Sequence, residues 1–146
     1  MDKNKLTWEE IKNSKAGTIF HDEFDDGVRF IVLRGPASLC AYVGVALDHP
    51  LANKSYNDLP ISAHGGLTFS DKGDGIRPEG YYWYGWDYSH CDDYSFYYDN
   101  PCLEKFTHSD IKWLVEDVVS DSWKTIYNFK KLVKLSEQIA RRGQNG

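Results

Sequence analysis

The spacing of hydrophobic residues changes about two thirds of the way along this chain. Up to residue 88, apolar residues alternate with polar ones or form short runs, which is typical of β-strands. The predicted strands are residues 18–24, 28–33, 39–47, 61–69 and 81–88, the last of them broken or bulged at Gly85. Asp25-Asp26-Gly27 predicts a hairpin turn between the first two strands, and residues 52–60 and 71–80 predict loops.

Helical spacing is found near both ends of the chain. Thr7 can cap a short helix that ends at Gly17. In the last third, residues 107–110 predict a helix start, followed at helical spacing by Ile111, Leu114, Val115 and Val118. A second helix places Trp123, Ile126, Phe129, Leu132, Leu135 and Ile139 on one broad face. Most of this face is expected to be core, but part of it, including Trp123 and Phe129, exceeds what one small sheet can cover, and that surplus suits a homodimer.

The order of these elements predicts an α+β fold, in which C-terminal helices and a short N-terminal helix pack on a mainly antiparallel β-sheet. The 146 residues fit a single domain, residues 1–146. The net charge of -5 argues against general binding to long nucleic acid, which depends on cationic contacts to phosphates. It does not exclude a single nucleotide held by local groups.

The chain has three cysteines, Cys40, Cys91 and Cys102, with no CxxC spacing. It also has no apolar segment that would serve as a signal peptide or cross a membrane. We therefore expect free thiols in a reducing cytoplasm, and a Cys91–Cys102 disulfide is the alternative.

Residues 81–98 contain ten aromatic side chains in eighteen positions, mixed with carboxylates and a histidine. A core needs apolar bulk, but buried hydroxyls and carboxylates need polar partners. This mixture favours one wall of a ligand pocket, with Trp83, Tyr84 and Trp86 as stacking faces. Alternation places Trp83 and Asp87 on one side of the strand and Tyr84 and Trp86 on the other, unless a bulge at Gly85 resets the register.

The segment from His64 to Thr68 reads His-Gly-Gly-Leu-Thr. Two glycines weaken a strand, and a close approach to the backbone is one reason to have them. We expect the amides of Gly65 and Gly66 to bind an anion, with side-chain contacts from His64 and Thr68. A β-bulge with a hydrogen-bonded histidine is the structural alternative.

Asp87, His90, Asp92 and Asp93 can be interpreted in three ways. They can hold a metal ion, for instance on His90 and Asp92, although their spacing matches no defined zinc or calcium pattern. They can form a solvated acidic turn. We prefer a third interpretation, in which Asp87 accepts hydrogen bonds from a ligand hydroxyl or amine and His90 donates to a phosphate, with no metal and no cofactor. Since histidines transfer protons near neutral pH, His64 and His90 are also the candidate catalytic pair.

Four blocks of the chain together resemble a largely uncharacterised family of small bacteriophage-encoded accessory proteins. They are residues 40–45, 49–51, 64–69 and 83–90, and the last two carry the His-Gly-Gly-Leu-Thr and Trp-x-Gly-x-Asp-x-x-His motifs. The resemblance covers roughly residues 39–93. The chain departs from the family pattern after His90, where Cys91-Asp92-Asp93 replaces the expected Gly-Asp.

The resemblance implies a phage accessory protein that works in the host cytoplasm. Combined with the aromatic pocket, it leads us to expect an anti-defence protein that sequesters a nucleotide-derived immune signal, such as a cyclic dinucleotide or cyclic ADP-ribose. One alternative is a phosphodiesterase that degrades such a signal with His64 and His90. The other is an inhibitor that binds a host protein without a small ligand.

Overall fold

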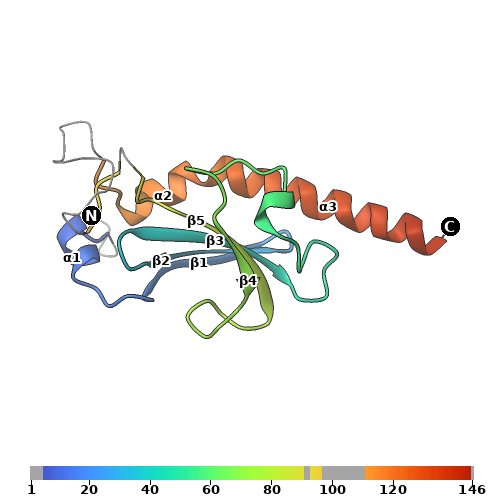
Figure 1. The fold of residues 1–146 in the computed structure, drawn as a ribbon, viewed down its shortest axis with the longest axis horizontal. Coiled ribbons are helices and arrows are strands. Elements are labelled where there is room, and N and C mark those ends of the chain that lie inside the picture. The colour runs from blue at the N-terminus through green and yellow to red at the C-terminus, as the bar shows by residue number, and fades with distance from the viewer. Residues whose placement is uncertain (1–4, 91–92, 97–110, 146) are drawn as a thin grey trace.

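A computed structural model describes residues 5–90, 93–96 and 111–145 of this protein. Their main feature is a five-stranded antiparallel sheet with strand order β1-β2-β3-β5-β4. The strands are β1 (Ile19–Asp25), β2 (Val28–Arg34), β3 (Leu39–Ala46), β4 (Phe69–Lys72) and β5 (Tyr81–Asp87). The helices are α1 (Trp8–Lys12), the 3-10 helix η1 (Tyr56–Asp58), α2 (Val115–Asp121) and α3 (Trp123–Asn145). The predicted α+β fold is confirmed (Figure 1).

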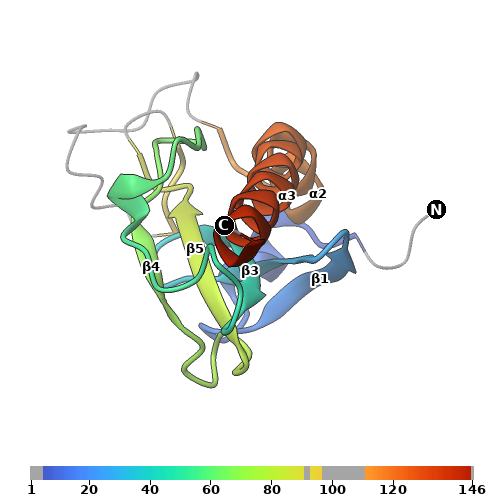
Figure 2. The same cartoon turned by 90° about the vertical axis from the view of Figure 1, so that its right-hand side faces the viewer.

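Each face of the sheet carries a cluster of buried side chains. Helices α2 and α3 lie across one face, and α3 is seen nearly end-on against it in Figure 2. Tyr84 and Trp86 of β5 belong to the core on this helical side, whereas Trp83 belongs to a smaller cluster on the other side. This is the predicted alternation along β5. The loop before β5 folds over the smaller cluster, where the Trp83 indole donates a 2.9 Å hydrogen bond to the Pro78 carbonyl.

Local sequence signals explain the elements at the N-terminal end. Thr7 and Glu10 form a capping box at the start of α1. The turn between β1 and β2 has positive φ angles at Asp26 (52°) and Gly27 (79°), as a two-residue hairpin loop requires. The predicted hairpin and the predicted start of the helix are confirmed, but α1 ends at Lys12 rather than at Gly17.

Two predictions about the strands need correction. Residues 61–68 form no strand; Ile61, Ala63 and Leu67 instead pack against the core from a loop, and β4 begins only at Phe69. Gly85 is not a bulge, because the pairing of β5 with β3 continues through it without a shift. Gly85 lies under the ring of Tyr42, which a Cβ at this position would overlap.

The C-terminal helices also differ in part from expectation. The predicted helix start at residues 107–110 lies outside the described residues, and α2 begins at Val115 with Leu114 as its N-cap. On α3, Ile126, Phe129 and Val133 are buried against the sheet. Of the two side chains expected to be surplus, Trp123 is exposed, whereas the expectation for Phe129 was wrong because it packs in the core; Leu135 and Ile139 are also exposed. Within the described residues, no helix has the length and apolar character needed to cross a membrane.

Candidate functional site

The two sequence motifs meet at the end of the sheet. Thr68 donates its backbone N–H to the Gly85 carbonyl at 2.9 Å, and Phe69 pairs with Gly85. This pairing brings the loop at 64–66 beside the residues that follow β5. Segments that are far apart in sequence therefore share one site.

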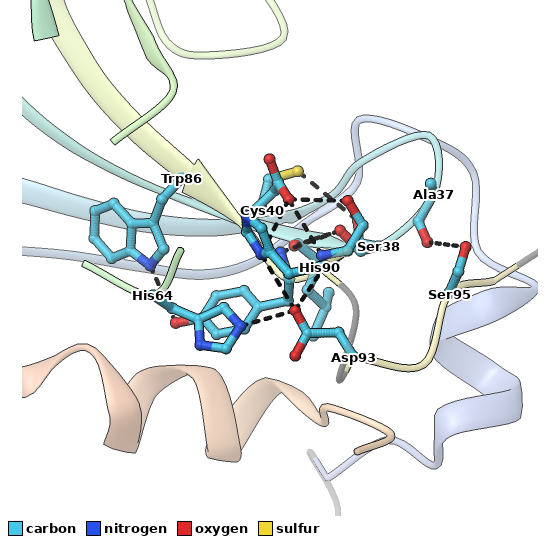
Figure 3. A network of polar contacts seen from close by, with 12 residues as sticks. Ala37, Ser38, Cys40, His64, Trp86, His90, Asp93 and Ser95 are labelled. Atoms are coloured by element: carbon cyan, nitrogen blue, oxygen red, sulfur yellow. Dashed lines mark hydrogen bonds and ion pairs between the residues drawn. The ribbon is translucent and has the colours of Figure 1, made fainter. Parts of the chain in front are cut away.

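Asp93 is the centre of this site, and its carboxylate is 1% exposed. Its Oδ2 atom lies 2.8 Å from His64 Nε2 and 3.3 Å from His90 Nδ1, and it also accepts the His90 backbone N–H at 2.9 Å. Its Oδ1 atom accepts the Trp113 indole N–H at 2.8 Å. Figure 3 shows the contacts of both histidines converging on this carboxylate. Both rings are partly open to solvent.

Gly65 allows His90 to reach this position. Its φ angle of +67° is one that L side chains rarely adopt, and a Cβ here would overlap the His90 ring. Gly66 has no atom within 4 Å of its Cβ position, and its N–H donates to the Ala63 carbonyl at 2.9 Å. The expectation of close approach is therefore met at Gly65, where the approaching group is the His90 ring, and the Gly66 amide already donates within the loop. Anion binding by the Gly65 amide stays a prediction.

Aromatic residues hold His64 in place. Its ring stacks on Tyr88 with centroids 4.5 Å apart and meets the edge of Trp113 at 5.1 Å. The Tyr88 hydroxyl donates to Asp121 Oδ2 at 2.8 Å and accepts the Trp86 indole N–H at 3.1 Å. These contacts link the site to the core and to α2.

The charges at the site depend on one another. Burial by itself would raise the pKa of Asp93, but hydrogen bonds from His64, the His90 backbone and Trp113 outweigh it and lower that pKa. The hydrogen bond to Asp93 raises the pKa of His64 against the opposing effect of burial, and the charges of Asp93, Asp121 and Asp87 act in the same direction. The two histidines therefore lie in a field dominated by carboxylates.

A polar cavity of about 280 Å³ opens beside His64. Its lining combines hydrogen-bond donors and acceptors from the loop, from the end of α2 and from the start of α3, namely Ser62, Ala63, His64, Asp121, Lys124, Thr125 and Asn128. The cavity gives a small molecule access to one edge of the site.

Of the other predicted site residues, Asp87 borders the site, with its Oδ1 atom 3.8 Å from His90 Nδ1, and the rest lie elsewhere. Trp83 and Tyr84 are 0% exposed and Trp86 is 2% exposed, so the structure places these rings in the core rather than on an open stacking wall. Asp87 accepts hydrogen bonds from the backbone and hydroxyl of Ser89, at 3.2 and 2.9 Å. The Thr68 side chain is exposed, and its backbone belongs to the sheet edge. Asp92, Cys91 and Cys102 lie outside the described residues, whereas Cys40 is a buried free thiol.

Sequence reasoning missed the central role of Asp93 and the contributions of Trp113 and Tyr88. The spacing His90-x-x-Asp93 was the available signal, because residues three apart in a tight turn can contact each other. Trp113 gave no such signal, since it reaches the site from a segment that is remote in the sequence.

Comparison of the chain with protein-family models, with curated proteins and with solved structures finds no match. The chemistry of the site is therefore argued from its own geometry.

Proposed function

We propose that this protein hydrolyses a phosphodiester bond in a small nucleotide-derived molecule, with His64, His90 and Asp93 at the reacting centre. The observation that carries the proposal is the convergence of two partly exposed imidazoles on one buried carboxylate, at the edge of a polar cavity. Titratable groups gathered in this way are typical of catalytic sites.

The reaction has requirements that these groups can meet. A water oxygen attacks phosphorus and loses a proton, the P–O bond to the leaving group breaks, and the leaving oxygen takes up a proton. The products are a phosphomonoester and an alcohol. The histidines can assist either by transferring these protons or by holding a metal ion that activates the water.

The size of the cavity and the charge of the chain limit the substrate. A cavity of about 280 Å³ suits one phosphate with part of its nucleoside better than a long strand. The net charge of -5 also disfavours a polyanion. Nucleotide signals of bacterial immunity meet both conditions, and we propose that the protein counters such a signal as a phage accessory protein in the host cytoplasm.

Sequestration without cleavage is the second candidate. It is supported by the mixed lining of the cavity, where Lys124 can contact a phosphate and Asn128 or Asp121 can contact a hydroxyl or amine. It loses support from the burial of the aromatic rings that were expected to stack on a base.

The test is to incubate the protein with cyclic dinucleotides and cyclic ADP-ribose isomers, denature it by heat and identify the released nucleotide by mass spectrometry. A linear dinucleotide produced from a cyclic dinucleotide supports phosphodiester hydrolysis, and an intact nucleotide of either kind that is retained until heating supports sequestration. The His64→Ala variant should lower turnover by roughly a hundredfold or more. His21→Ala is the matched control, because His21 is on β1, at the other end of the strand order from the β4–β5 side where the site lies. If no nucleotide is bound or cleaved, both candidates are wrong.

A further inference from the structure

Three potential metal ligands from two segments lie at one point of the site. They are one ring nitrogen of His64, one ring nitrogen of His90 and a carboxylate oxygen of Asp93, which all lie within 4.8 Å of one another. We propose that His64, His90 and Asp93 bind one divalent transition-metal ion, and that Zn²⁺ is the ion that fits this donor set best.

The distances suit a shared ion. Donor atoms bound to a tetrahedral Zn²⁺ at about 2.0–2.1 Å are roughly 3.3 Å apart. Asp93 Oδ2 lies 2.8 Å from His64 Nε2 and 3.3 Å from His90 Nδ1. Binding the ion requires His64 Nε2 to move slightly away from Oδ2, and it requires the two ring nitrogens, which now lie within 4.8 Å of each other, to stand roughly 3.3 Å apart.

The hydrogen bonds that Asp93 accepts also support this metal site. Without a metal, Asp93 Oδ2 faces nitrogen atoms of both imidazole rings and of the His90 backbone. An ion in front of Oδ2 would replace the two ring protons and leave the backbone hydrogen bond intact. Each imidazole would then bind through a neutral nitrogen, which is its normal state as a metal ligand.

A second layer of contacts orients the three ligands, as in established metal sites. Trp113 fixes the other oxygen of Asp93 by a 2.8 Å hydrogen bond. Tyr88 stacks on the His64 ring, and Gly65 leaves the space that the His90 ring occupies.

The local charge also favours a cation. Asp87 Oδ1 lies 3.8 Å from His90 Nδ1, and Asp121 is bound to Tyr88 beneath the His64 ring. With Asp93, this makes three carboxylates around two imidazoles. A phosphate would be repelled from such a site, whereas a bound dication would reverse the local sign and attract it. This catalytic use of the ion rests on the proposed function, but the binding of the ion does not.

The chemical class of the ion follows from the donors. Two imidazole nitrogens and one carboxylate oxygen suit first-row transition metals better than Ca²⁺ or Mg²⁺, which prefer oxygen ligands. Three protein ligands leave a fourth position for water, as in catalytic zinc sites, where the bound water loses its proton near pH 7.

The test uses the full-length chain, freed of metal with a chelator and titrated with Zn²⁺ by calorimetry and with Co²⁺ by visible absorption. We expect one ion per chain. His64→Ala and His90→Ala should each weaken Zn²⁺ binding by at least a hundredfold, whereas His21→Ala should leave it unchanged. Trp113→Phe keeps an aromatic ring but loses the hydrogen bond to Asp93, and it should weaken binding by roughly 10–100-fold. Circular dichroism identifies any variant that fails to fold, and the proposal is then judged on the remaining variants.

Zn²⁺ binding that is absent, or equally strong in the His64, His90 and His21 variants, would overturn the metal site. The two proposals can fail separately. Zn²⁺ binding without cleavage of any nucleotide leaves the metal site standing and removes hydrolysis. Full cleavage by the metal-free protein removes the catalytic use of the ion and leaves hydrolysis by proton transfer, and the titration alone decides whether the ion binds.

Discussion

At the scale of single residues, Gly65 and Gly66 occupy neighbouring positions for different physical reasons. Both have positive φ angles, but only Gly65 faces another side chain, the ring of His90. The sequence indicated that something approaches this backbone closely. It could not identify what approaches, because His90 comes from a segment 25 residues further along the chain.

Replacing each glycine by alanine separates these effects. Both Gly65→Ala and Gly66→Ala should lose about 1–2 kcal/mol of the free energy of unfolding, because alanine is strained at positive φ. Gly65→Ala should also displace His90, and thereby weaken Zn²⁺ binding and nucleotide cleavage by at least tenfold. Urea unfolding and Zn²⁺ titration of both variants are the measurements. Equal effects of the two substitutions on Zn²⁺ binding would contradict the assigned contact.

Cys40 gives a prediction about reactivity. Burial raises the pKa of its thiol to about 11, and the nearby charge of Asp87 acts in the same direction. At pH 8 the reactive thiolate should therefore be roughly a hundredfold scarcer than in an exposed cysteine. We expect iodoacetamide to modify Cys40 slowly in the folded protein and rapidly in urea, as measured by mass spectrometry of the peptide that contains it. Rapid modification of the folded protein would show that this strand is open to solvent.

At the scale of elements, short sequence signals predicted correctly those structures that form between residues close together in the sequence. Asp26-Gly27 predicted the hairpin because few residue pairs adopt two consecutive positive φ angles. The strand predicted at 61–69 was wrong, because apolar residues that alternate can also pack on a core from a loop. A strand differs from such a loop in being hydrogen-bonded to a neighbouring strand, and the pattern of apolar residues does not show whether such a neighbour exists. The bulge predicted at Gly85 fails for the same reason, since the ring that requires glycine there belongs to β3.

The contact between β3 and β5 can be tested at Gly85. A Cβ there would overlap the Tyr42 ring, so Gly85→Ala should lower the free energy of unfolding by about 1–3 kcal/mol. Tyr42→Ala removes the obstacle, although it leaves a cavity of its own. The double variant should therefore lose clearly less than the sum of the two single losses, as measured by urea unfolding. Strict additivity would show that the ring is not the reason for glycine.

At the scale of the whole molecule, α3 is longer than the sheet needs. Its 23 residues span about 35 Å. The buried side chains Ile126, Phe129 and Val133 are in its first half, whereas Leu135 and Ile139 beyond them are 50% and 57% exposed. Figure 1 shows this part of the helix extending past the sheet. The homodimer expected from the apolar surplus stays a prediction.

Substitutions on α3 test that prediction. Leu135→Ser with Ile139→Ser should change the free energy of unfolding of the monomer by no more than about 0.5 kcal/mol per site, because both side chains are exposed. Val133→Ala, which opens a buried position, should cost more. If α3 forms the dimer, sedimentation should detect a dimer that the double serine variant loses. A dimer that survives both substitutions must use another surface.

The position of Asp93 has a consequence for how the protein folds. It binds His64, 29 residues earlier, and Trp113, 20 residues later. Neither partner can be brought to Asp93 by local structure, so the entropy of closing both loops must be overcome first. The site should therefore assemble late, after β5 has joined the sheet and α2 has docked. A ligand that needs Asp93, His64 and Trp113 in their native positions binds only the complete fold. Its binding would therefore show that the chain has folded, and it would also stabilise the protein against global unfolding.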